Sequence, residues 1–119
     1  MYITNIETVK KGRFAGPMVV SRRPFRTELV QQVIEVTTHF GDAYGAPPVQ
    51  YDGNYFALGI KDLAKPDFGD SVTVREGEIP VFWACGVTPQ LAIARAKPPF
   101  AIKHAPGCMF VTDLRAPNL

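Results

Sequence analysis

The sequence has few cysteines and no long apolar run, and each absence excludes a class of protein. Two cysteines among 119 residues, without pairs at metal-ligand spacing, exclude a zinc framework and predict free thiols in a reducing compartment, with a disulfide as the open alternative. No apolar stretch approaches the ~20 residues that cross a bilayer, and residues 1–11 lack a signal-peptide pattern. We therefore expect a soluble, cytoplasmic chain that has no membrane partner.

An excess of charge of one sign is also missing. Thirteen Lys and Arg against eleven Asp and Glu leave a formal net charge of +2, and the basic residues are scattered, which argues against nucleic acid as a partner. A content of 46% apolar and 20% charged residues is typical of one globular domain. Ten glycines and eleven prolines exceed the usual share of roughly 12%, so many turns must interrupt short elements.

Periodicity in the first half predicts two strands, one helix and one hairpin. Apolar residues alternate loosely over 1–9 and form a short run at 18–20, as in strands. Over 27–40 they recur at three and four residues, which predicts an amphipathic helix that must pack on a sheet. Within 49–60, an Asp-Gly pair between two apolar runs predicts a hairpin.

The second half predicts a buried strand followed by a helix. Residues 79–85 are almost all apolar, as in a strand covered on both faces. Thr88 is suited to cap a helix and Pro89 is favoured at its first position, which predicts a helix over 90–97. Two further short strands are predicted at 100–102 and 109–111.

The passage from that strand into the helix is the first candidate site. Free backbone N–H groups at Gly86 and Thr88 would lie at the positive end of the helix, where carboxylates or phosphates bind. The same end would lower the pKa of Cys85 and suit it to act as a nucleophile or hydrogen-bond donor. The alternative is that Cys85 is a small core residue and Thr88 only a cap.

The turn that follows His104 suggests an acid–base residue. The stiff sequence Ala-Pro-Gly after His104 would hold the imidazole away from the flanking strands, whereas His39 lies on the predicted helix. Asp113 follows an apolar run and could orient a histidine or bind an amine. A structural histidine and an ordinary strand-end carboxylate are the alternative interpretations.

The densest basic cluster lies at residues 22–26. An arginine there, Arg22 or Arg23, could clamp a substrate carboxylate with two parallel hydrogen bonds. A solvated loop face is the alternative. The acidic residues at 62, 67 and 70 have irregular spacing and are assigned to turns rather than to a cation site. No nucleotide-binding or serine-elbow motif is present.

Two long stretches carry a resemblance to a known family. VTVREGEIPVFWACGVTPQ at 72–90 and PPFAIKHAPG at 98–107 resemble the hydro-lyase family related to D-glutamate cyclase. Shorter stretches match in the same order at 2–5, 16–21, 23–25 and 45–47. The resemblance therefore covers essentially the whole chain.

The resemblance implies an α/β (α+β) fold, a layered mixed sheet with helices. Residues 1–60 would form a small α+β subdomain and residues 61–119 part of an α/β sandwich domain. Family members are longer, and this chain begins where their second portion begins, so part of the site is expected to lie elsewhere. Cys108 stands where relatives often carry histidine, which leaves His104 as the only histidine of its turn.

The resemblance also implies a lyase that acts on a small amino or hydroxy acid with loss of water. In the cyclase version, the α-amine of D-glutamate attacks its own γ-carboxyl group to give 5-oxoproline, without a cofactor or metal. The expected site comprises catalytic His104, Cys85 and Asp113, and substrate-binding Gly86, Thr88, Arg22 and Arg23. The alternative is a non-catalytic fragment that binds a carboxylate or forms a homo-oligomer.

Overall fold

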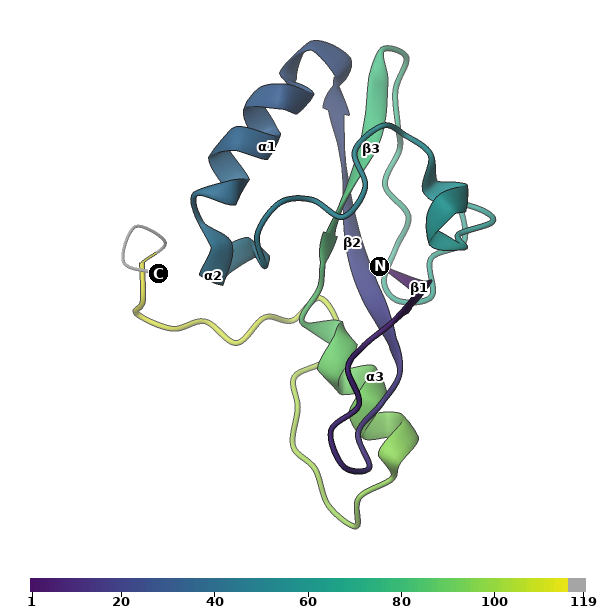
Figure 1. The fold of residues 1–119 in the computed structure, drawn as a ribbon, viewed down its shortest axis with the longest axis vertical. Helices are drawn as coiled ribbons and strands as arrows, with labels where there is room; N and C mark the ends of the chain where they lie inside the picture. The colour runs from purple at the N-terminus through teal and green to yellow at the C-terminus, as the bar shows by residue number, and fades with distance from the viewer. Residues whose placement is uncertain (116–119) are drawn as a thin grey trace.

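A computed structural model, which describes residues 1–115, places three strands in one antiparallel sheet. The strands are β1 (Tyr2–Glu7), β2 (Pro17–Arg26) and β3 (Glu78–Ala84), in the order β1-β2-β3 (Figure 1). The predicted strands at 1–9 and 79–85 are confirmed with small shifts at their ends. Together with its helices, the sheet makes a small α+β fold.

The central strand β2 is much longer than the predicted 18–20. Its polar half pairs with β3 residue for residue, from Val20 opposite Ala84 to Arg26 opposite Glu78. Backbone pairing with β3 holds this half in the sheet whatever its side chains, and five of the seven residues from Val20 to Arg26 are at least partly buried. The strand therefore continues through a basic segment that has no apolar run.

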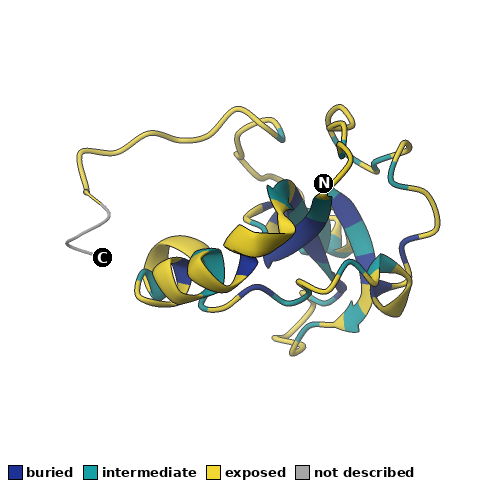
Figure 2. Ribbon diagram, turned by 90° about the horizontal axis from the view of Figure 1, so that it is seen from above, coloured by how far each residue is buried: buried dark blue, intermediate teal, exposed yellow. Residues whose placement is uncertain are grey.

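The two faces of the sheet carry separate hydrophobic clusters because successive side chains of a strand point in opposite directions. One face holds Tyr2, Val20 and Phe82, covered by Leu58 and Ile60. The other face holds Val81 and Trp83 beneath Val30 of helix α1 (Val30–Thr38). Figures 1 and 2 show α1 and the 55–60 region on opposite sides of the buried strands.

The helix predicted over 27–40 is confirmed in its middle and is divided at both ends. It begins as a 3-10 turn, η1 (Thr27–Leu29), and it is followed by the short helix α2 (Gly41–Tyr44). Inside, the indole Nε1 of Trp83 donates a hydrogen bond to Thr37 Oγ1 at 3.3 Å. This buried bond ties α1 to the sheet.

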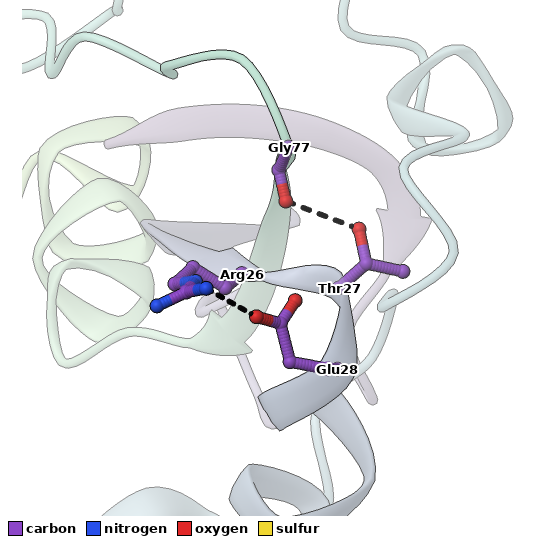
Figure 3. Close-up of polar contacts among 4 residues, drawn as sticks. All are labelled: Arg26, Thr27, Glu28 and Gly77. Carbon is purple, nitrogen blue, oxygen red and sulfur yellow. Dashed lines mark hydrogen bonds and ion pairs between the residues drawn. The ribbon is translucent and has the colours of Figure 1, made fainter.

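Figure 3 shows how the end of β2 is joined to the turn before β3. The backbone N–H and the hydroxyl of Thr27 both donate to the Gly77 carbonyl, at 3.1 and 3.2 Å. Arg26 and Glu28 form an ion pair at 2.7 Å, but their side chains are 70% and 58% exposed. Exposed pairs contribute only ~0–1 kcal/mol, so the Thr27–Gly77 contacts, not this pair, hold the junction.

The hairpin predicted within 49–60 is wrong. Val49 N–H donates to the Phe82 carbonyl at 2.9 Å, and Phe82 N–H donates to the Gln50 carbonyl at 2.8 Å, so this segment bridges the free edge of β3. The carboxylate of Asp52 then accepts from Asn54 N–H at 2.8 Å, and the chain winds into a 3-10 turn, η2 (Tyr55–Leu58). Contact with a distant strand has replaced pairing with the neighbouring one.

After β3, helix α3 (Val87–Ala96) forms where a helix was predicted, but it begins two residues before Pro89, the predicted first position. The strands predicted at 100–102 and 109–111 are wrong: these residues are exposed and lie in no strand. In the described residues, no helix is long and apolar enough to span a membrane.

The division into units 1–60 and 61–119 stays a prediction. The single sheet takes β1 and β2 from the first range and β3 from the second. The last four residues of the second range lie outside the described residues.

Candidate functional site

The residues that lead from β3 into α3 are held by the backbone of β2. Cys85 N–H donates to the Val19 carbonyl at 2.9 Å, and Thr88 N–H donates to the Cys85 carbonyl at 2.9 Å. Gly86 is the residue before the helix, and it is exposed with open space beside its Cα atom. The start of α3 is therefore anchored on one side and open on the other.

The prediction that the Thr88 side chain caps α3 is wrong. Its hydroxyl accepts a hydrogen bond from Val19 N–H at 2.9 Å and donates one to the Val19 carbonyl at 3.1 Å. Val19 presents both backbone groups because β3 ends at Ala84, before it reaches the position opposite Val19. Thr88 thus satisfies the backbone of β2 at the point where the sheet stops pairing.

Arg22 is a buried cation without a carboxylate partner in the described part of the chain. The residue is only 8% exposed, and its Nη2 donates a hydrogen bond to the Val72 carbonyl. Its Cζ lies 5.6 Å from the centre of the Tyr2 ring, in cation–π geometry. The ion pairs found within residues 1–115 involve other cations. Because no buried side-chain nitrogen there lacks a hydrogen-bond partner, the remaining guanidinium nitrogens reach solvent.

Arg22 lines a cavity of about 310 Å³. The cavity walls come from the segment at 63–64 and from the extended segment at 71–74, which includes the hydroxyl-bearing Ser71 and Thr73. This volume lies at the small end of the range for ligand sites. A guanidinium and two hydroxyl side chains at one cavity suit a small acid.

Tyr2 shapes the electrostatics beside that cavity. Burial raises the pKa of the Tyr2 phenol, the nearby Arg22 opposes this shift, and the balance is a raised pKa. The phenol O–H donates to the Leu63 carbonyl at 2.7 Å. Tyr2 therefore stays neutral near neutral pH, and it contributes a ring face rather than a counter-charge to Arg22.

Arg23 lies apart from Arg22 although the two are adjacent in sequence. Successive residues of β2 face opposite sides of the sheet, and Arg23 is exposed. The structure therefore separates the two candidate arginines, and only Arg22 lines the cavity.

His104 lies beside the first turn of α3, against Gln90. The ammonium of Lys103 donates to Gln90 Oε1 at 3.3 Å, which identifies the other amide atom as the nitrogen. That nitrogen lies 3.2 Å from His104 Nε2, and His104 Nδ1 lies 2.8 Å from the Ala105 carbonyl. Since a carbonyl only accepts and an amide NH₂ only donates, both contacts fit a neutral imidazole with its proton on Nδ1.

Gln90 is the residue of this cluster that sequence reasoning missed. It is only 7% exposed, and it lines a second cavity of about 100 Å³ together with Lys103. A signal was present, because Val87, Gln90 and Ala94 recur at helical spacing and would share one face of α3. A polar residue on such a face usually has a specific partner.

The remaining candidates lie apart from these clusters. Asp113 is exposed and forms no hydrogen bond or ion pair with another residue in 1–115. Cys85 is half-buried and Cys108 is exposed, and the predicted free thiols are confirmed. Within the same residues, no group of three His, Cys, Asp or Glu side chains could hold a metal ion. The structure thus brings His104 and Lys103 together at α3 and places Arg22 at a separate cavity.

Comparison with known proteins places the chain among longer relatives. A family model described as D-glutamate cyclase matches residues 1–113. A protein of Geobacillus kaustophilus (strain HTA426), named "Putative hydro-lyase GK2103", is 56% identical over 119 residues, covering 100% of this chain and 44% of the relative. "Putative hydro-lyase YcsI" of Bacillus subtilis (strain 168) is 51% identical, with 100% and 46% covered. The chain spans less than half the length of these relatives.

Proposed function

Because this chain belongs to the D-glutamate cyclase family, we propose that it is the carboxylate-binding part of a hydro-lyase-type enzyme. The substrate is a small amino or hydroxy acid that loses water. The observation that carries the proposal is Arg22, a buried guanidinium at a cavity of about 310 Å³ with no carboxylate partner in residues 1–115.

The energetics of a buried charge favour a bound anion at this position. Removing an ion from water costs several kcal/mol unless a counter-charge and hydrogen bonds compensate. Arg22 has one hydrogen bond, to the Val72 carbonyl, and one ring face, that of Tyr2. A carboxylate in the cavity would accept two parallel N–H hydrogen bonds from the guanidinium. Such charge-assisted bidentate pairs are among the strongest hydrogen-bonded pairs in proteins.

In the cyclase version of the reaction, one carboxylate of the substrate reacts and the other serves as a handle. The α-amine of D-glutamate attacks the γ-carboxyl carbon, a C–N bond forms, and a C–O bond breaks. The α-ammonium loses two protons, one to become a nucleophilic amine and one as the C–N bond forms, and the departing oxygen takes up two, so the products are 5-oxoproline and water. Arg22 is proposed to hold the α-carboxylate, which does not react.

The proton transfers are assigned to the cluster at α3. His104 is proposed as the acid–base residue, a role worth ~100- to 10,000-fold in rate, with Gly86 contributing a backbone N–H group. The Thr88 N–H is already bonded to the Cys85 carbonyl, and Cys85 or Asp113 is proposed to assist although neither contacts His104 in this structure. His104 and Arg22 share no contact in this structure. We therefore infer that the complete site also draws on residues beyond the stretch that the relatives share with this chain.

Thermal unfolding with D-glutamate tests the binding role of Arg22. A ligand that binds only the native state stabilises it by mass action, so D-glutamate should raise the melting temperature of the unaltered chain. Arg22→Lys keeps the charge but loses the planar fork, and it should weaken binding roughly tenfold, about 1.4 kcal/mol. Arg13→Lys is the matched control, because Arg13 is exposed in the loop after β1.

One result would contradict the binding role of Arg22, and a second measurement separates binding from catalysis. Equal stabilisation of Arg22→Lys and the unaltered chain would remove Arg22 from the carboxylate site. Proton NMR of the same samples follows 5-oxoproline formation. Stabilisation accompanied by fully recovered D-glutamate would leave this chain a binding module without catalysis of its own.

A further inference from the structure

The segment after α3 exposes more large apolar side chains than any other part of the described chain. Its six large apolar residues are each between 65% and 85% exposed. They are Phe100, Ile102, Met109, Phe110, Val111 and Leu114. Figure 2 shows most of the segment in the colour of exposed residues, leading away from the buried strands. Single exposed apolar residues are ordinary, but a dense group of them marks an interaction site.

A well-formed turn divides this segment into two arms. Cys108 N–H donates to the Ala105 carbonyl at 2.9 Å, Pro106 occupies the second position, and Gly107 has φ +86°. A proline followed by a residue with positive φ is the signature of a type II turn. The turn separates an arm at 100–103 from an arm at 109–112, and a type II turn splays its flanking segments rather than pairing them.

The arms nevertheless pair neither with each other nor with the sheet. No residue from 97 to 115 lies in a β-strand, and both arms are exposed. An isolated two-stranded hairpin is at best marginally stable in water, and it needs a third strand or a helix to cover its apolar face. The arms are therefore two exposed apolar segments that lack the surface that would order them as strands.

The length of the relatives indicates what that surface is. The match to the Bacillus subtilis relative covers all of this chain, arms included, but only 46% of the relative, so 54% of it lies outside the matched stretch. The arms are thus shared with proteins that carry further polypeptide in the same chain. A tethered partner is present at high effective concentration, which favours it over a second copy of this chain.

We propose that the two arms dock as β-strands on the part of the family's polypeptide that lies outside the matched stretch. Edge pairing satisfies the backbone groups of the arms, and the apolar side chains pack beneath. The proposal rests on the arms alone and is independent of carboxylate binding at Arg22.

A binding experiment with the remaining portion of a relative tests the proposal. The residues of the Bacillus subtilis relative outside the matched stretch are produced as a separate polypeptide and titrated with this chain by calorimetry. Hydrogen exchange of residues 99–114 is measured with and without that polypeptide. We expect a complex, slower exchange in both arms, and binding weakened at least about tenfold by Ile102→Ser with Phe110→Ser.

Val9→Ser provides the matched control, because Val9 is an apolar residue of equal exposure, 82%, in the loop after β1. Unimpaired binding by the arm variant would overturn the proposal. So would protection of the arms that grows with the concentration of this chain alone, since that identifies a second copy as the occupant.

The intact relative provides a second measurement if the separate polypeptide does not fold. Its residues that align with 99–114 should exchange slowly, at rates close to those of its buried strands. Fast exchange there, as expected for the exposed arms of this chain, would overturn the proposal without any reconstituted complex.

Discussion

Strand β3 and the arms that follow α3 are two apolar regions with opposite fates. Val81 and Phe82 of β3 are fully buried, whereas Ile102 and Phe110 of the arms are more than 80% exposed. β3 pairs with β2 along one edge and is bridged by residue 50 on the other. The two segments are similarly apolar, but only the one that has a partner strand in the described chain is buried.

The largest expected difference between the regions is in stability. Phe82→Ala removes a fully buried ring from the cluster around Tyr2 and Val20, and it should lower the free energy of unfolding by about 3–5 kcal/mol. Phe110→Ala should change it by less than about 0.5 kcal/mol. Urea unfolding of both variants measures the contrast. A loss above about 1 kcal/mol in Phe110→Ala would show that the arms already pack on this chain.

A smaller effect is expected where β3 ends and α3 begins. Thr88→Val removes the hydroxyl that bonds both backbone groups of Val19. It should cost about 1–3 kcal/mol because the Val19 N–H loses its partner, whereas the Val19 carbonyl keeps the Cys85 N–H. Hydrogen exchange at the Val19 amide should become faster. Thr38→Val, which removes an exposed hydroxyl bonded within α1, is the control. An equal loss in the free energy of unfolding in both variants would show that the bonds to Val19 stabilise the fold no more than an exposed hydroxyl does.

The smallest effect concerns the pH dependence of stability near Tyr2. Burial raises the pKa of Tyr2 above that of the unfolded chain, so the folded state holds the phenol proton to higher pH. Its contribution is complete below about pH 10 and is lost as the pH rises through the folded pKa. Between about pH 9 and 11, the free energy of unfolding should fall less steeply with pH in Tyr2→Phe than in Tyr51→Phe. Identical slopes would contradict the assignment.

The local sequence pattern predicted the elements whose apolar residues form a regular stripe or a continuous run. The middle of α1 follows from its apolar stripe, and β3 from its continuous apolar run. The second half of β2 could not be predicted in this way, because its basic residues are held by pairing with β3, more than fifty residues later. The predicted 49–60 hairpin does not form for the same reason, because residues 49 and 50 pair with the edge of β3 instead.

The candidate site was predictable by residue type but not by arrangement. The sequence offered Arg22 or Arg23 within a basic cluster. Their separation onto opposite faces depends on this segment being a strand, where a solvated loop was the alternative. His104 was named from its turn, and its contact with Gln90 required the chain to return along α3. The sequence pattern alone does not show where a loop folds back onto an earlier helix.

The most direct test of carboxylate binding at Arg22 is NMR titration of its side chain with D-glutamate in uniformly ¹⁵N-labelled protein. We expect the Nε–H resonance of Arg22 and the amides of residues 71–74 to shift together and to saturate with one dissociation constant. An Arg22 resonance that stays in place while other amides respond, or a spectrum that does not respond at all, would contradict this assignment.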